Sequence, residues 1–155
     1  MDYVDKLFSG KWNKLKDDIS GYKKIEFPGV YMLAYSSENL IGKKVRLDDV
    51  FYIGMSNSRG GIEQRIYQFI NSINGGGGHS AGTRFYVDYC RKKPFYKFKI
   101  NRSLYFTYAS IPCEVRKDVR KANDLRFMGE VAKLEYYALA YLKEHIGSEP
   151  ELNKK

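Results

Sequence analysis

Four residues, far apart in the chain, are of the types that phosphate chemistry uses. Arg65 carries a planar, permanently charged guanidinium, which can donate to two phosphate oxygens at once. Glu135 carries a carboxylate, and a single carboxylate suits a Mg²⁺ ion that keeps several waters and takes further ligands from a phosphate. Tyr31 and Tyr52 each stand in an apolar run, two residues from a glycine. Hydrolysis of a phosphodiester needs an activated water and neutralised phosphate charge, so this set of residues suits that reaction.

The carboxylate has two competitors in the same stretch of sequence. Glu130 and Glu144 belong to the same predicted helix and are equally suited by type to bind a metal ion. Glu135 is preferred because Leu134 and Ala138 belong to the apolar stripe of that helix and place Glu135 at the border of the stripe. The tyrosines have a competing interpretation too, since aromatic residues in strands commonly pack in a core.

Short periodic segments, separated by glycines and prolines, predict the elements that hold these residues. Two runs rich in strand formers, 29–35 and 50–54, are expected to pair as an antiparallel hairpin with a long loop. Apolar residues at intervals of three and four predict a helix over 62–73, which ends at the glycines 75–78. The other predicted elements are a helix over 2–19 bent at Gly10, a short helix over 83–91, strands over 97–100 and 103–111, and a long helix that begins at a cap at Asn123 or Asp124 and ends at Gly147.

Together these elements predict an α/β fold, more narrowly α+β, with a small, mainly antiparallel, three-stranded sheet flanked by helices. At 155 residues the chain has the length of one domain and can bury a core without disulfides. We divide it into an N-terminal helical extension, 1–27, and a main domain, 28–155, within a single compact unit.

The composition argues against secretion and against a membrane-spanning segment. Two cysteines, Cys90 and Cys113, are too few for a disulfide framework and are not spaced as zinc ligands. The N-terminus has no apolar leader, and the longest apolar run, 136–142, is too short to cross a bilayer. We therefore expect a cytoplasmic protein without a membrane partner.

The positive charge of the chain is concentrated in one segment. The sequence has 27 lysines and arginines against 18 acidic residues, a net charge of +9. Between Arg84 and Lys121, eleven basic residues face three acidic ones, so this segment carries nearly all of the excess. A polyanion such as nucleic acid is the expected partner, because a basic protein of general purpose would spread its charge evenly. The residues expected to contact phosphates are Arg84, Arg91, Lys92, Lys93, Lys97, Lys99 and Arg102.

Two tripeptides and the residues that follow them resemble one enzyme family. Gly29-Val30-Tyr31 and Tyr52-Ile53-Gly54 stand about twenty residues apart and are followed in order by Ser56, Arg65, His79, Glu135 and Asn153. This order over residues 28–155 resembles the GIY-YIG nucleases. The pair of motifs with its following residues is more specific than either tripeptide alone.

The resemblance implies a divalent-metal-dependent DNA endonuclease that uses Mg²⁺ or Mn²⁺ at Glu135. It implies that Tyr31 acts as general base on the attacking water, that Tyr52 and His79 complete its hydrogen-bond network, and that Asn153 lies beside the site. A tyrosine of ordinary pKa, about 10, is a poor base at neutral pH, so a nearby cation such as Arg65 would have to lower it.

The sequence departs from the family in the longer loop over 55–64, at Phe69 and in the length of the basic segment 84–121, and one alternative function stays open. Phe69 stands where many members carry a tyrosine or histidine, and Tyr67 or His79 would have to take that role. The competing function is a nucleic-acid-binding module that uses the same fold without cleaving. For a nuclease of this size, sequence recognition would come from insertions within the domain or from a homodimer on a symmetric site, as in the small restriction enzymes, and a repair or mobile-element nuclease is the other candidate.

Overall fold

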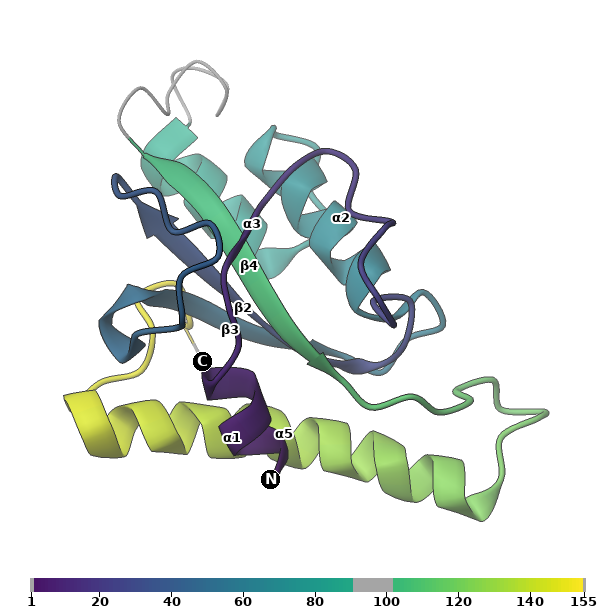
Figure 1. Ribbon diagram of the computed structural model, residues 1–155. Helices are drawn as coiled ribbons and strands as arrows, with labels where there is room; N and C mark the ends of the chain where they lie inside the picture. The colour runs from purple at the N-terminus through teal and green to yellow at the C-terminus, as the bar shows by residue number, and fades with distance from the viewer. Residues whose placement is uncertain (1, 91–101, 155) are drawn as a thin grey trace.

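The computed structural model describes residues 2–90 and 102–154. Within these residues the chain forms an antiparallel sheet of four strands in the order β1-β4-β2-β3, with helices on both faces (Figure 1). The strands are β1 (Asn13–Lys14), β2 (Gly29–Ser36), β3 (Val50–Ser56) and β4 (Ser103–Ser110). The helices are α1 (Tyr3–Phe8), α2 (Gly61–Ile73), α3 (Ser80–Phe85), α5 (Ala122–Ile146), the short 3₁₀ helix η1 (Leu47–Asp49) and the π-helical turn η2 (Tyr86–Cys90).

Strand β2 is central and is buried on both faces. Its neighbours are β3 on one side and β4 on the other, both antiparallel to it. Alternate residues of β2 enter two separate apolar clusters, Val30 and Met32 in one, Tyr31 and Leu33 in the other. A strand covered on both faces reads as one continuous apolar run, which is how residues 29–35 stand in the sequence.

The two clusters lie on opposite faces of the sheet. On the first, called the α5 face, α5 and α1 pack through Val131, Leu134, Ala138, Leu142, Leu7 and Phe8 (Figure 1). On the second, called the α2/α3 face, the packing residues include Ile62, Ile66, Phe69, Ala81 and Phe85. The molecule is therefore a helix–sheet–helix sandwich, and the prediction of a sheet flanked by helices is confirmed in this general form.

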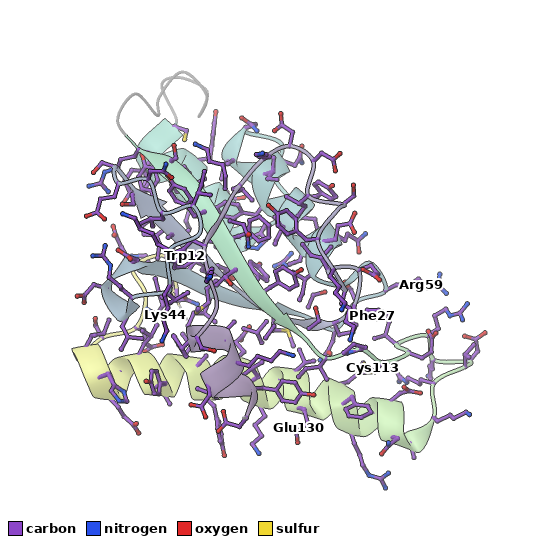
Figure 2. The ribbon with its side chains drawn as sticks, in the orientation of Figure 1. Trp12, Phe27, Lys44, Arg59, Cys113 and Glu130 are labelled. Carbon is purple, nitrogen blue, oxygen red and sulfur yellow. The ribbon has the colours of Figure 1, made fainter. Side chains whose placement is uncertain are left out.

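The prediction of three strands and the prediction of a helix over 2–19 are wrong. Helix α1 ends at Phe8 with the cap Ser9, and from Lys11 onward the backbone bonds to distant parts of the chain instead of continuing the helix. The Trp12 N–H donates to Lys43 O at 3.0 Å, and Gly42 N donates to Trp12 O at 2.9 Å (Trp12 and Lys44 are labelled in Figure 2). Asn13 and Lys14 then pair with β4 as the fourth strand. A strand of two residues has no periodicity, so only this long-range pairing reveals it.

The hairpin of β2 and β3, helix α2 and helix α5 agree with the sequence predictions. Helix α5 ends at Gly147, whose φ of 82° lies in the left-handed region that favours glycine. Its start differs from the prediction, since Lys121 is the cap and Asp124 lies inside the first turn, accepting from Lys121 N at 2.8 Å. The strand predicted over 97–100 lies outside the described residues. No helix in the described part of the chain is long and apolar enough to cross a bilayer.

Candidate active site

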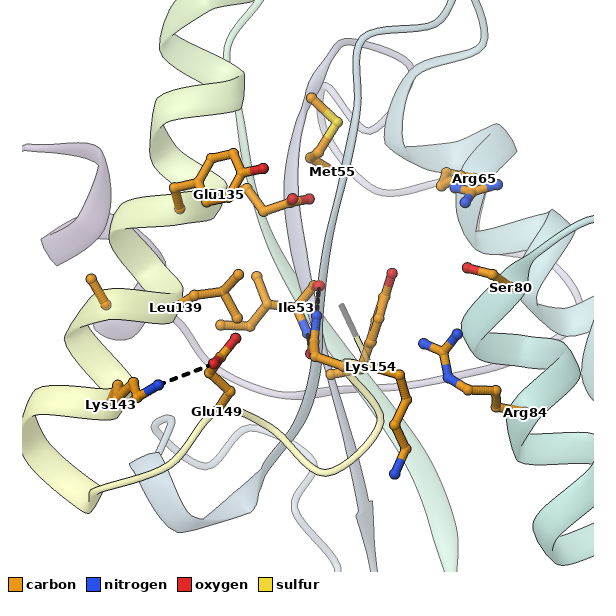
Figure 3. A pocket seen from close by; sticks show the side chains of 14 residues that line it. Ile53, Met55, Arg65, Ser80, Arg84, Glu135, Leu139, Lys143, Glu149 and Lys154 are labelled. Atoms are coloured by element: carbon orange, nitrogen blue, oxygen red, sulfur yellow. Dashed lines mark hydrogen bonds and ion pairs between the residues drawn. The ribbon is translucent and has the colours of Figure 1, made fainter.

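A pocket of about 410 Å³ opens beside β3, the strand at the edge of the sheet, between the helices of the two faces. Glu135 and Leu139 of α5 line one wall, and Arg65 of α2, Ser80 and Arg84 line the other, with Ile53 of β3 between the walls (Figure 3). Tyr52 and Asn153 also line it. The fold therefore brings together Tyr52, Arg65, Glu135 and Asn153, which the sequence analysis singled out individually.

A bulge in β3 aims Tyr52 at the α2/α3 side of this edge. Leu33 pairs with Tyr52 while the next residue of β2, Ala34, pairs with Val50, so Phe51 is an extra residue in β3. A bulge of this kind turns neighbouring side chains to the same face. Phe51 and Tyr52 accordingly both belong to the α2/α3 cluster, and Tyr52, 9% exposed, keeps contact with the pocket.

Behind Tyr52, a chain of hydrogen bonds runs through Tyr31 to His79. The Tyr31 hydroxyl lies 2.6 Å from Nε2 of His79, and Nδ1 of His79 accepts from the backbone N–H of Gly82 at 3.2 Å. A neutral imidazole carries its proton on the nitrogen that does not accept, so Nε2 donates to Tyr31. Because the Tyr31 hydroxyl accepts from His79, its own proton is left to face the neighbouring Tyr52 hydroxyl, with which it interacts. The donors of the chain therefore all point from the interior toward the pocket.

Burial sets the protonation states along this chain. It raises the pKa of Tyr31, which is 0% exposed, well above the ordinary value, and the neighbouring Tyr52 adds to the rise. Burial also lowers the pKa of His79 to about 3, with the positive charges of Arg65 and Arg84 as lesser causes. The pKa of Tyr52 is raised by burial and then by the charge of Glu135. At neutral pH, His79 is therefore uncharged and Tyr31 keeps its proton.

The glycines of the two tripeptides make room for these tyrosines and for the sheet. Gly54 pairs with Tyr31 across the hairpin, and a Cβ at Gly54 would lie 2.6 Å from the Tyr31 hydroxyl oxygen. A Cβ at Gly29 would meet Ala109 O on β4 and lie 2.7 Å from Cδ1 of Ile62 on α2. Each tripeptide therefore needs its glycine for a steric reason. Gly54 leaves space for the Tyr31 ring to lie over β3, and Gly29 lets α2 pack close to the sheet.

Arg65 is held in place by the loop of glycines that follows α2. Its Nη1 donates to Oε1 of Gln68 at 2.7 Å and to the carbonyl of Gly78 at 3.3 Å. The loop is itself tied back to α2, where Asn71 Nδ2 donates to Gly77 O at 3.1 Å. Both bonds to Arg65 use the same nitrogen, so the guanidinium is fixed at one corner while its side chain lines the pocket.

Arg84 adds a second guanidinium to the same wall. Its Nη2 donates to the carbonyl of Leu152 at 2.6 Å, which ties α3 to the C-terminal segment. Its Nε is buried and has no hydrogen-bond partner among the described residues. A buried guanidinium N–H without an acceptor is costly. The side chain of Arg84 lines the pocket and adds a second permanent positive charge to it.

Glu135 is the carboxylate that fits a metal ion here. Of its competitors, Glu130 lines a smaller pocket elsewhere, and the other acidic residue in this pocket, Glu149, is paired with Lys143 at 3.4 Å. Across residues 2–90 and 102–154, no group of three or more His, Cys, Asp and Glu side chains could enclose a metal ion. Glu135 lies on the wall opposite two arginines, and a carboxylate in that place would suit Mg²⁺, which keeps water ligands and shares phosphate oxygens.

Asn153 clamps the C-terminal segment to the edge of β3. Its Nδ2 donates to Ile53 O at 2.9 Å, and its Oδ1 accepts from Ile53 N at 3.0 Å. The backbone N–H of Leu152 donates to Phe51 O at 3.0 Å, two residues along the same strand. The side chain therefore covers an exposed strand edge and holds the backbone next to Tyr52 in place.

The remaining predicted residues lie elsewhere. His79 is 2% exposed and packs against Phe69, with ring centroids 5.4 Å apart, while Tyr67 accepts from Ile19 N on the outer side of α2. Arg102 lies over the ring of Tyr35 at 5.3 Å and lines another pocket. The predicted phosphate contacts that fall outside the described residues are Arg91, Lys92, Lys93, Lys97 and Lys99.

The sequence analysis missed several residues of the pocket. Arg84 was predicted as a phosphate contact of the basic segment but not as part of the catalytic set, and the structure places it on the wall with Arg65. Ser80, Lys143 and Lys154 carried no signal of their own. For Tyr136 a usable signal existed, because it directly follows Glu135 and stands outside the apolar stripe of α5.

Comparison with known proteins adds no relative. No protein-family model matches the chain, and no curated protein or solved structure matches it at a significant level. Its function must therefore be inferred from the geometry of the pocket and the chemistry of its residues.

Proposed function

We propose that this protein is a divalent-metal-dependent endonuclease that hydrolyses phosphodiester bonds in DNA. The observation that carries the proposal is the pocket itself, which joins a tyrosine of β3, an arginine of α2 and a glutamate of α5 in about 410 Å³. Further support comes from the net charge of +9 and from the order of the two tripeptides, Arg65 and Glu135, which resembles the GIY-YIG nucleases.

The two walls of the pocket would have different roles in the reaction. Arg65 and Arg84, on one wall, would bind the oxygens of the phosphate, and Glu135, on the other, would hold Mg²⁺ or Mn²⁺. The ion, when bound, would supply positive charge to the phosphate and lower the pKa of a coordinated water. The four basic residues that line the pocket outnumber its two carboxylates, Glu135 and Glu149, so its lining has a net charge of +2, which suits an anionic substrate.

Tyr52 is the tyrosine placed to accept a proton from the attacking water, once its own hydroxyl proton has left through the pocket and it is a phenolate. Burial and then the charge of Glu135 raise the pKa of Tyr52, whereas Arg65 and Arg84 lower it, and a cation bound at Glu135 would offset the effect of that carboxylate. Tyr31, to which the family resemblance gives that role, is fully buried and does not line the pocket, whereas Tyr52 does. The hydrogen bond that Tyr31 donates to Tyr52 would stabilise the negative charge of a Tyr52 phenolate, and His79 fixes the direction of that bond. We therefore assign Tyr52 as the base and Tyr31 as the residue that positions and supports it.

The test is cleavage of supercoiled plasmid in Mg²⁺ or Mn²⁺ by the wild type, Glu135→Gln and Arg65→Ala. Nicking by the wild type and a loss of at least about 100-fold in each variant are expected, since each variant removes an electrostatic contact to the reacting phosphate. Glu144→Gln is the matched control, because Glu144 is an exposed carboxylate of the same helix. It should cleave like the wild type.

Cleavage that survives Glu135→Gln, or that is indifferent to a chelator, would overturn the proposal. A wild type that shifts DNA at low salt but nicks no substrate would instead identify the competing function, a binding module without nuclease activity. Whether the substrate is cut by a monomer or a homodimer is read from the sedimentation of the same preparation.

A further inference from the structure

One wall of the pocket carries an aromatic ring that the fold leaves exposed. Tyr136 of α5 is 71% exposed, the largest exposed fraction among the exposed large hydrophobic residues of the described chain, and it lines the pocket next to Glu135. Single exposed apolar residues are common on protein surfaces, but this ring borders a charged pocket. A ring in this position is available to contact part of a bound substrate.

The two walls of the pocket differ in chemistry as the two parts of a nucleotide do. Arg65 and Arg84 lie on one wall, and Glu135 and the half-buried, apolar side chain of Leu139 lie on the other (Figure 3). Tyr136 follows Glu135 on α5 and also lines the pocket. A nucleotide has an anionic phosphate at one end and a flat, largely apolar base at the other. The volume of about 410 Å³ lies in the range of roughly 300–1,000 Å³ that is usual for pockets that hold small organic groups.

We propose that the pocket binds an unpaired nucleotide, with its phosphate on Arg65 and Arg84 and its base stacked on Tyr136. In a duplex, both faces of a base are covered by its neighbours, so a base can stack on a side chain only after it leaves the stack. The substrate would accordingly be a single strand, a loop or a nucleotide turned out of a duplex. This inference rests on the proposed nuclease function and specifies its substrate.

The neighbouring residue provides a matched control. Tyr137 is also exposed, at 56%, but it follows Tyr136 by one position on the helix and therefore points about 100° away. It lines a different pocket with Glu130, and the Lys133 ammonium lies 5.1 Å from its ring centroid. The two rings thus have the same type and similar exposure, but only Tyr136 faces the candidate active site.

The test measures DNA binding without cleavage. Fluorescence anisotropy in the presence of EDTA gives the Kd of a labelled single-stranded oligonucleotide and of the same sequence fully paired. Tyr136→Ala should weaken single-strand binding roughly 5- to 100-fold, the size of one lost base–aromatic stack, and Tyr136→Phe should restore it. Tyr137→Ala should bind like the wild type, and binding of the paired duplex should change less than about 2-fold in all variants, since it offers no free base face.

A strand of abasic phosphodiesters separates stacking from any other effect of the substitution. On this strand the wild type and Tyr136→Ala should bind alike, because no base is present to stack. An equal loss on the paired duplex, a loss that persists on the abasic strand, or no loss at all would overturn the inference while plasmid cleavage still supports the nuclease. A wild type that binds neither form of DNA and cleaves no plasmid would overturn the proposed function as well.

Discussion

The two faces of the sheet are equally buried but carry different chemistry. Tyr31 and Met32 are neighbours on β2, both 0% exposed, and they enter opposite clusters. Met32, on the α5 face, meets Val30 and Leu134 in a cluster of apolar contacts. Tyr31, on the α2/α3 face, joins His79 and Tyr52 in a directed chain of hydrogen bonds.

We infer from this contrast that the α5 face contributes mainly to stability and the α2/α3 face mainly to activity. On the α5 face, burial of aliphatic surface stabilises the fold and anchors α5, which carries Glu135. On the α2/α3 face, part of the buried volume is given to polar groups whose hydrogen bonds are aimed at the pocket. Substitutions on the first face should lower the free energy of unfolding, and substitutions along the hydrogen-bond chain should lower the rate.

The largest expected effect follows removal of the hydroxyl that faces the pocket. Tyr52→Phe should lower the cleavage rate about 10²- to 10⁴-fold, the usual contribution of a general base. Tyr31→Phe should cost less, about 10- to 100-fold, because it removes one hydrogen bond to a charged group and leaves the base in place. Single-turnover cleavage of plasmid by each variant, with circular dichroism to verify folding, gives both values.

Tyr35→Phe is the control for these two variants. Tyr35 is also on β2 but lies at another pocket, so its hydroxyl should not affect the rate. A Tyr31→Phe variant slower than Tyr52→Phe would reverse the assignment and make Tyr31 the base. Equal losses of cleavage rate in all three variants would show that the hydrogen-bonded tyrosines are no more important for cleavage than another tyrosine of the same strand.

Local sequence signals predicted the strands and helices that carry the site, but not the elements and caps that depend on contacts between distant residues. The β2–β3 hairpin, α2 and α5 follow from apolar runs, from intervals of three and four residues and from terminal glycines, all of which act over short distances. Strand β1 has two residues and exists through its pairing with β4, about ninety positions away, so no local pattern marks it. The cap of α5 was misplaced because Asp124 bonds backward to Lys121 from inside the helix.

The residue types of the candidate site were predictable from the sequence. Which of them line the pocket and which lie buried behind it was not. Tyr31 and Tyr52 look alike in the sequence, and only the bulge at Phe51 and the packing of α2 decide that Tyr52 reaches the pocket. Arg84 was hidden in a run of basic residues, because its place depends on the contact with Leu152 at the other end of the chain. Asn153 has a signal as a polar residue beside the site, whereas its two bonds to Ile53 are visible only in the structure.

On the α5 face, Met32→Ala should lower the free energy of unfolding by about 2–5 kcal/mol, since it leaves a cavity in a fully buried strand. The cleavage rate of the folded protein should stay within a few-fold of wild type, because Met32 points away from the pocket. Denaturation in urea measures the first quantity, and cleavage at low temperature, where the variant is folded, measures the second. A rate loss comparable to that of Tyr52→Phe in a folded Met32→Ala variant would show that the two faces are not separable.

The smallest expected effect is a dependence of stability on pH that comes from His79. Burial holds its pKa near 3 in the folded protein, whereas the unfolded chain has an ordinary histidine value of about 6.5. Between these values the unfolded chain binds more protons, so the free energy of unfolding falls as the pH is lowered through this range. From pH 7 to pH 5, where most carboxylates stay ionised, His79 should account for a loss of about 2 kcal/mol.

His79→Gln removes the titrating group while keeping a side-chain amide that can donate to Tyr31. Its free energy of unfolding should therefore change by about 2 kcal/mol less than that of the wild type between pH 7 and pH 5, whatever its value at pH 7. A wild-type slope in His79→Gln would mean that His79 titrates in the folded protein as it does in the unfolded chain. In that case burial on the α2/α3 face would not disfavour a charged imidazole. His79 would then not be held neutral, and the proposed direction of the hydrogen bonds from His79 to Tyr52 would be wrong.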